Sequence, residues 1–209
     1  MKIELERVAP MEIEARSFEI IESELPHPID PGLAPIIKRV IHTTADFDYA
    51  DNLFFSEHAP SVGIEALRRG CDIVTDTQMA KSGISKATLA KLGGEVHCFM
   101  SDPDVAAEAK ARGVTRALVC MEKAAKLEKP CIFAIGNAPT ALIRIRELMD
   151  AGELSPALVI GVPVGFVNVV ESKELIIETE VPHIVARGRK GGSNVAAAIV
   201  NALLYQITR

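Results

Sequence analysis

The sequence predicts an α/β fold of three layers, in which a mainly parallel central sheet of about five strands carries helices on both faces. From Pro60 onward, short apolar segments alternate with longer segments of helical character. The short segments are almost continuously apolar, as is typical of parallel strands that are buried on both faces. Apolar residues make up 48% of the 209 residues, which is enough for one sizeable core. We therefore expect a single domain over residues 1–209, with residues 1–59 forming a mostly helical N-terminal segment packed on it.

The N-terminal segment is predicted to hold two helices. The first spans Pro10–Glu24, and the prolines within residues 26–31 then interrupt regular structure. The second runs from about Pro31 to His42, because its apolar residues recur at helical spacing. Asp30 is expected to cap it, with proline at the first helical position.

The rest of the chain is predicted to alternate between strands and helices, with glycines closing several helices. The expected strands are Cys71–Thr75, Glu95–Met100, Cys131–Ile135, Ala157–Gly161 and His183–Ala186. The expected helices are one that ends at Arg69 and those at 85–92, 102–113, 115–128, 139–151, 167–175 and 193–207.

Composition argues against several classes of protein. The net charge is −5, and no basic stripe is interleaved with aromatic residues, so nucleic-acid binding is not expected. No apolar run approaches the roughly 20 residues that span a bilayer. The N-terminus is charged where a signal peptide is apolar, and the four cysteines form no Cys-x-x-Cys pair. We expect a cytoplasmic protein with reduced, buried thiols and neither a zinc site nor a disulfide framework.

Candidate ligand-binding residues follow the strands, because ligands of open parallel sheets lie beyond the carboxyl ends of the strands. The loops in question are residues 76–83, 136–140, 162–165 and 187–193. The residues that they offer for binding are Thr77, Met79, Lys81, Gly83, Asn137, Ala138, Thr140, Gly165, Arg189 and Lys190.

Two of these loops allow two interpretations each. Residues 136–140, Gly-Asn-Ala-Pro-Thr, form good helix-start chemistry, yet the same exposed N–H groups could bind a carboxylate. Residues 188–193, Gly-Arg-Lys-Gly-Gly-Ser, are either a flexible turn or an anion site in which Arg189 and Lys190 supply charge. This second loop fits neither nucleotide-binding glycine pattern, so a nucleotide site has little support.

The segment Arg39-Val-Ile-His-Thr-Thr-Ala-Asp-Phe-Asp-Tyr49 offers a candidate catalytic histidine. Histidine exchanges a proton near neutral pH, and Thr43, Thr44 and Asp46 are near enough in sequence to fix the ring of His42. Thr43 and Thr44 are also candidate substrate-binding residues. The simpler interpretation is a histidine that ends a helix, where its partial positive charge suits the helix dipole. The other histidines lack metal-ligand spacing, so no metal site is predicted.

Five segments taken in order resemble the motifs of the precorrin-8X methylmutase (precorrin isomerase) family, which includes the cobalt-precorrin-8 methylmutases. They are RVIHTTADFDY, DTQMAKSGI, GNAPTAL, GVPVGFVNVVESKE and GRKGGSNVAAAIVNALL, and the resemblance extends from about Ser17 to Leu204. The clearest departure is Val167–Val170, where the family pattern has a glycine and smaller residues.

The resemblance implies an isomerase of cobalamin biosynthesis. A methyl group moves from C11 to C12 of the contracted tetrapyrrole, giving hydrogenobyrinate, or cobyrinate when cobalt is bound. No cofactor is required, since any cobalt is carried by the substrate. The protein must hold a flat polycarboxylate ring and exchange a proton with it, so that the migrating bond weakens.

The resemblance also implies roles for particular residues. His42 matches the catalytic acid/base of the family, and Ser17 and Arg39 match positions that contact substrate. A homodimer with its sites near the subunit interface is expected. Two other functions stay open on the sequence alone: a non-catalytic corrinoid-binding or carrier protein, and a nucleotide-dependent enzyme on a similar sheet.

Overall fold

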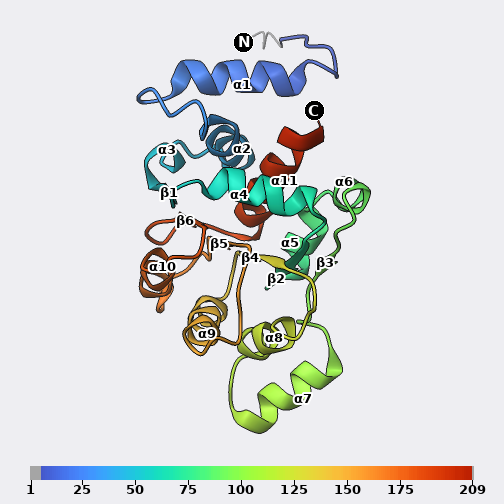
Figure 1. Cartoon of the computed structure of the whole chain (residues 1–209). Coiled ribbons are helices and arrows are strands. Elements are labelled where there is room, and N and C mark those ends of the chain that lie inside the picture. Colours follow the sequence, from blue (N-terminus) through green and yellow to red (C-terminus); the bar gives the residue numbers. More distant parts are fainter. Residues whose placement is uncertain (1–5, 209) are drawn as a thin grey trace.

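The computed structural model describes residues 6–208, so the parts of the sequence predictions that concern residues 1–5 and 209 lie outside it. Within the described chain, one six-stranded sheet is covered by helices on both faces (Figure 1). The predicted three-layer α/β class is therefore confirmed, with one strand more than the five expected.

The sheet has the order β1-β6-β5-β4-β2-β3. Neighbouring strands are parallel except that β1 runs antiparallel to β6 at one edge. The strands are β1 (Leu53–Phe55), β2 (Asp72–Thr75), β3 (Val96–His97), β4 (Cys131–Ile135), β5 (Leu158–Gly161) and β6 (His183–Ala186).

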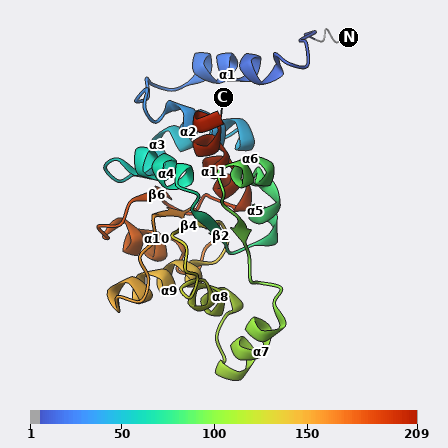
Figure 2. The same ribbon diagram turned by 45° about the vertical axis from the view of Figure 1, so that its right-hand side comes forward.

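One helical layer is built from both ends of the chain. It contains α1 (Ile13–Glu24), α2 (Ala34–Thr44), α3 (Tyr49–Asn52), α4 (Ala59–Arg68), α5 (Gln78–Gly83), α6 (Lys86–Lys91) and α11 (Ser193–Thr208). The opposite layer contains α7 (Pro103–Arg112), α8 (Arg116–Ala124), α9 (Pro139–Asp150) and α10 (Val169–Ile177). Figure 2 shows α1 farthest from the sheet, where it packs on α2.

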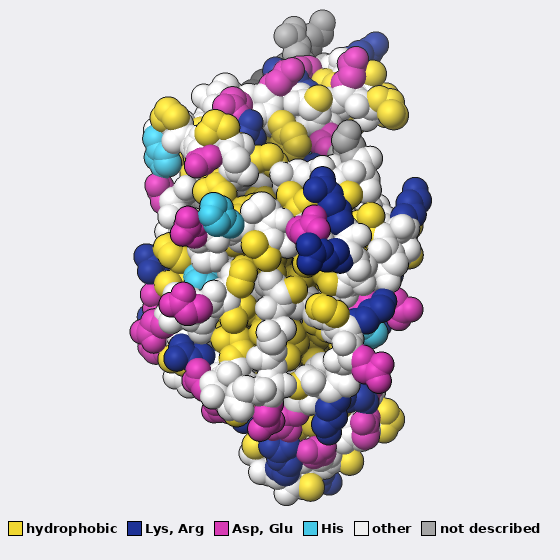
Figure 3. All heavy atoms as spheres, in the orientation of Figure 1, with side chains coloured by type: hydrophobic (Ala, Val, Ile, Leu, Met, Phe, Trp, Pro, Cys, Tyr) yellow, Lys and Arg dark blue, Asp and Glu magenta, His cyan; other side chains and the backbone are white. Residues whose placement is uncertain are grey.

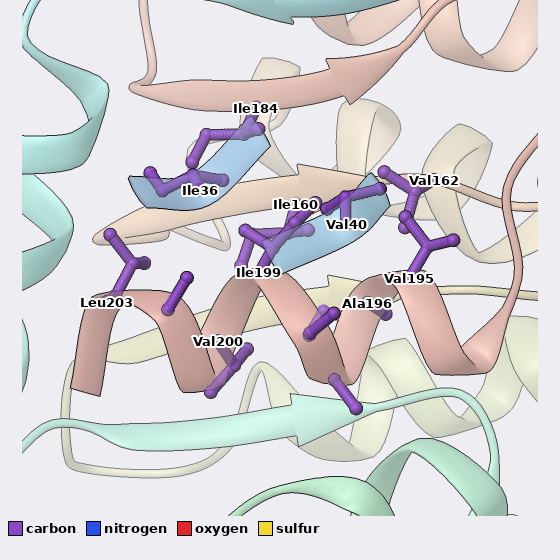
Figure 4. Packing of buried hydrophobic residues seen from close by; sticks show 14 of the residues in the cluster. Ile36, Val40, Ile160, Val162, Ile184, Val195, Ala196, Ile199, Val200 and Leu203 are labelled. Atoms are coloured by element: carbon purple, nitrogen blue, oxygen red, sulfur yellow. The ribbon is translucent and has the colours of Figure 1, made fainter. Parts of the chain in front are cut away.

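Two hydrophobic cores follow from the alternation of side chains along each strand. In β4, Ile132 and Ala134 join the core under α2 and α11, whereas Phe133 and Ile135 join the core under α7 to α10. Figure 4 shows the first core, in which α2 and α11 press branched apolar side chains onto β5 and β6. Because α2 carries His42, this packing fixes where the candidate catalytic residue lies.

Three local predictions need correction. The edge strand β1 was not predicted, residues 78–83 form the short helix α5 instead of a loop, and β3 is shorter than the expected Glu95–Met100. The side chain of Thr77 caps α5 by accepting a hydrogen bond from Ala80 N at 3.1 Å. Threonine is a common helix cap, but the segment that follows it is too short to show a helical period, so the sequence did not predict the helix.

The second predicted helix begins at Ala34, three residues later than expected. Asp30 accepts a hydrogen bond from Gly32 N at 2.7 Å, so its carboxylate closes the turn before the helix instead of capping it. At the other end, Ala45 adopts the left-handed conformation with φ +53° and turns the chain sharply just after His42.

The surface carries charges of both signs. On the face in Figure 3, Lys and Arg side chains are interspersed with Asp and Glu, most densely at the end formed by α7 and α8. Among residues 6–208, no helix combines the length and the apolarity needed to cross a membrane. All four cysteines are buried free thiols, as the sequence predicted.

Candidate active site around His42

An open cavity of about 270 Å³ lies between α2, the end of α5, and α11. Arg39, His42 and Thr43 line it from α2, and Gly83 lines it from α5. A Cβ atom on Gly83 would lie 2.9 Å from Cβ of Ala197, so only glycine lets α5 and α11 approach this closely. The structure thus brings together four of the residues that were proposed from the sequence.

The remaining wall of the cavity comes from one face of α11, which sequence reasoning missed. The lining residues Asn194, Ala198, Asn201 and Tyr205 recur three or four positions apart, as one helical face requires. Two asparagines seven positions apart, and so on one face of a mostly apolar helix, were the available signal. The amide of Asn201 donates to Gly83 O and accepts from Ser85 N, each at 2.9 Å, and so ties α5 to α11.

Arg39 is held between two aromatic rings at the edge of this cavity. Its guanidinium carbon lies 4.8 Å from the ring centre of Phe18 and 5.2 Å from that of Tyr205. Its Nη2 donates to Glu14 Oε1 at 2.8 Å, and only 13% of the side chain is exposed. The guanidinium is therefore held rigidly and is partly desolvated, with the Glu14 carboxylate on one of its nitrogens.

His42 is exposed, and its ring meets the edge of Phe18 at 5.5 Å between ring centres. The expectation that Thr43, Thr44 and Asp46 fix the ring is wrong. The two threonine hydroxyls donate to carbonyls one turn back in α2, and the Asp46 carboxylate binds Lys190. The imidazole is consequently positioned by helix geometry and by Phe18.

Ser17 does not belong to the residues that line this cavity. Its hydroxyl donates to Ile13 O at 2.8 Å within α1. Its neighbour Phe18 contacts both Arg39 and His42 instead. In this arrangement α1 reaches the site through an aromatic ring.

A buried carboxylate, that of Asp76, organises the carboxyl ends of the central strands. It follows β2 and accepts hydrogen bonds from the backbone N–H groups of Gly136, Asn137 and Ala138 at 2.9, 2.8 and 2.6 Å. Burial raises the pKa of this carboxyl group, and the three backbone donors oppose the rise. The predicted use of these donors for a substrate carboxylate is therefore wrong, because a carboxylate of the chain itself occupies them.

Other strand-end candidates have partners within the protein. Thr77 Oγ1 lies 2.7 Å from Ser193 Oγ, which joins the end of β2 to the start of α11. Thr140 Oγ1 lies 2.8 Å from Thr115 Oγ1, which joins the start of α9 to the start of α8, and Thr140 does not line the His42 cavity. Met79 is 69% exposed on α5, and Lys81 lies in the last turn of the same helix.

Both cations that were predicted as binding residues in the loop after β6, Arg189 and Lys190, are engaged. Lys190 Nζ binds Asp46 at 2.7 Å and Asp48 at 2.5 Å, and the Asp46 contact lowers the pKa of that carboxyl group. The same two contacts raise the pKa of Lys190. Arg189 lies over the ring of Phe166 at 5.4 Å, so this pair brings the loop after β6 beside the loop after β5.

Residues 167–170, in the loop after β5, are where the sequence differs from the pattern of the family that it resembles, and the backbone conformation there accounts for the difference. Asn168 adopts φ +56°, a left-handed conformation that glycine adopts freely and asparagine tolerates. Gly165, one of the predicted site residues, donates its N–H to Arg189 O at 3.2 Å. Asparagine therefore preserves the turn that a glycine would make at residue 168.

No group of three or more His, Cys, Asp or Glu side chains in the described chain is arranged to hold a metal ion. The chemistry available around His42 is instead an imidazole, a fixed guanidinium that is paired with Glu14, and several uncharged polar groups. This set suits proton exchange with a bound anionic ligand.

Comparison with known proteins identifies the relatives of this chain. The sequence model of the precorrin-8X methylmutase family (CbiC) matches residues 12–206. A cobalt-precorrin-8 methylmutase from Priestia megaterium is 48% identical, over 94% of this chain and 88% of the relative. One from Salmonella typhimurium is 49% identical, over 95% of this chain and 96% of the relative.

A solved structure agrees with these sequence matches. The crystal structure of a precorrin-8X methylmutase from Thermus thermophilus superposes with a TM-score of 0.86 at 38% sequence identity. The superposition covers 94% of this chain and 98% of that chain, so the sheet and both helical layers are shared over nearly their full extent.

Proposed function

Because the chain belongs to the precorrin-8X methylmutase family, we propose that His42 is the acid/base that exchanges a proton with the tetrapyrrole ring during methyl migration. Membership confirms the expected isomerase function in cobalamin biosynthesis. One observation supports this role for His42: its exposed ring lines the same cavity as the fixed guanidinium of Arg39.

In the proposed mechanism, Arg39 positions the substrate and His42 exchanges a proton with it. Arg39 binds a peripheral carboxylate and fixes the ring against α11. The imidazole of His42 then exchanges a proton with the conjugated ring system, which favours the tautomer in which the bond from C11 to the methyl group is weakened. The methyl group moves within one molecule, so the chain needs no resident cofactor for electron or group transfer.

The substrate is proposed to carry cobalt. Support comes from the names of the two relatives, each a cobalt-precorrin-8 methylmutase at almost half identity over most of this chain. Anaerobic turnover of cobalt-precorrin-8 and of metal-free precorrin-8 tests both the isomerase and its substrate. Faster turnover of the metal-free form would reverse the assignment of cobalt, and no turnover of either form would reject the isomerase function.

A second copy of the chain is proposed to complete the site. A cavity of about 270 Å³ lies below the roughly 300–1,000 Å³ that usually encloses a drug-sized ligand, and a tetrapyrrole is larger still. Exposed apolar side chains such as Met79 and Phe166 offer further surface for burial. Sedimentation equilibrium over a range of concentrations measures whether the protein is a homodimer.

The four buried free thiols suit the cytoplasm, where we place the enzyme.

We further propose that residues 1–209 form one domain, since α1, α2 and α3 contribute to the same core as α11. Asn137, Thr140, Arg189 and Lys190 remain proposed substrate contacts through their side chains. Of these, Asn137, Arg189 and Lys190 are exposed at strand-end loops.

Arg39→Ala is expected to weaken the affinity for the product by about 1–3 kcal/mol, because a partly desolvated charged hydrogen bond is lost. The Arg189→Ala/Lys190→Ala double variant should lose less per cation, since both are exposed and solvent screens them, but about tenfold in affinity for the pair together. Product titrations across a salt series measure both losses. The control Arg69→Ala removes an exposed arginine with its own glutamate partner on α4. Unchanged affinity and salt slope in both test variants would reject the electrostatic account.

A further inference from the structure

The loop between β6 and α11, residues 187–192, is here termed the glycine-rich loop. Gly188, Gly191 and Gly192 all have positive φ, at +75°, +157° and +141°. A loop with three such glycines has many alternative conformations when nothing holds it, so ordering it is costly. A specific anchor is therefore needed to keep it in one shape.

Lys173 supplies that anchor from α10. Its side chain is fully buried, and its Nζ donates to Gly188 O at 2.7 Å and to Lys190 O at 2.8 Å. Burial lowers the pKa of this amine to about 8. Burying an amine in this way is unfavourable unless its hydrogen bonds are made, and both acceptors here are carbonyls of the glycine-rich loop.

Two backbone contacts hold the same loop from its other side. Gly192 N donates to Val162 O at 2.8 Å, and Arg189 O accepts from Gly165 N at 3.2 Å. A Cβ atom on Gly191 would lie 2.2 Å from Val162 O, so the two loops meet at backbone distance. The glycine-rich loop is consequently enclosed between Lys173 and the β5–α10 connection.

The loop conformation decides where two cations point. Lys190 reaches Asp46 and Asp48 in the turn that follows His42, and Arg189 lies over Phe166. Both side chains stay exposed while the backbone beneath them is fixed. If the backbone were released, the cations would sample many positions and would have to be ordered again at every binding event.

We propose that Lys173 is a positioning residue that holds the glycine-rich loop in the conformation presenting Arg189 and Lys190 to the peripheral carboxylates of the substrate. The inference rests on the proposed function, since it assumes that the ligand is the polycarboxylate ring. Lys173 touches no ligand itself, because its amine is enclosed by the protein.

The test replaces Lys173 with methionine, an unbranched side chain one atom shorter that carries no donor. We expect about tenfold weaker binding of cobyrinate, the cobalt-containing product, and a similar rise in KM, with a smaller change in kcat. The matched control is Lys110→Met, the same change at an exposed lysine of α7.

A double-mutant cycle separates positioning from general damage. In the Arg189→Ala/Lys190→Ala background, Lys173→Met should cause no further loss of affinity, because the cations that it positions are absent. An equal tenfold loss in that background would overturn the proposal, as would unchanged affinity in Lys173→Met or in the Arg189→Ala/Lys190→Ala variant. Failure of the proposed function is distinguishable, since wild type would then turn over neither cobalt-precorrin-8 nor metal-free precorrin-8, and would bind neither cobyrinate nor hydrogenobyrinate.

If Lys173→Met does not fold, Lys173→Gln replaces it in the same double-mutant cycle. Glutamine keeps two N–H donors on a neutral group. An independent readout on wild type is the backbone order parameter of Gly188, Arg189 and Lys190. We expect values near those of rigid backbone, about 0.85. Values below about 0.6 would show a loop that is not held and would overturn the proposal.

Discussion

His42→Asn is expected to lower the turnover of cobalt-precorrin-8 by about 10²–10⁴-fold, the usual loss when one acid/base is removed. Asparagine keeps a polar group of similar size but cannot exchange a proton near neutral pH. Because His42 is exposed and its ring contact is with the edge of Phe18, the fold should remain near wild type. The measurement is kcat under anaerobic conditions, together with the thermal midpoint and the product affinity.

The matched control for this experiment is His58→Asn. His58 is also exposed, and it adopts the left-handed conformation with φ +61° that asparagine tolerates. It precedes α4 and lies outside the cavity, so turnover should not change. Near-normal turnover in His42→Asn would show that the proton comes from another group. Loss of product binding together with turnover would instead mean that His42 holds the ring and does not act on it.

The central strands were predictable because each is a short, fully buried apolar run between clear breakers. β4 and β6 occupy Cys131–Ile135 and His183–Ala186 as predicted, and α7 ends at the left-handed Gly113 as expected. The edge strand β1 has only three residues, and it forms because β6 offers an open edge to Leu53–Phe55. No local periodicity can show such a pairing, which joins segments about 130 residues apart.

The site was predictable where a local motif carries it. Arg39 and His42 share α2 and one cavity, and the resemblance to the family singled out both. The electrostatic partners were not predictable in the same way. Lys190 and Asp46 are separated by 144 positions in the sequence, so only the fold reveals that Lys190 binds two aspartates beside His42. Polar residues near each other in sequence, such as Thr43 and Asp46, turned out to serve the backbone and Lys190.

The segment Gly136–Thr140 shows how a correct chemical interpretation can name the wrong ligand. Its backbone N–H groups do bind a carboxylate, as the helix-start pattern predicted. That carboxylate is Asp76, which lies 60 positions earlier in the chain and follows the neighbouring strand β2. Parallel strand pairing between β2 and β4 brings the two loops together at one edge of the sheet. The arrangement fixes the start of α9 before any substrate binds.

Asp76→Ala is therefore expected to destabilise the protein by about 3–5 kcal/mol, because three backbone donors lose a buried acceptor at once. Asp76 is fully buried, so water cannot replace the lost contacts without opening the sheet edge. For a chain of this length, such a loss lowers the thermal midpoint by about 6–20 °C.

Calorimetry or denaturant unfolding measures the loss of stability. The control is Asp104→Ala, because Asp104 is an exposed aspartate of α7 whose removal should change stability little. Asp76→Asn should also destabilise, since one amide oxygen cannot serve donors that now bind both carboxylate oxygens. A midpoint near wild type in Asp76→Ala would mean that the three N–H groups find other acceptors, and the proposed anchoring of α9 would then be wrong.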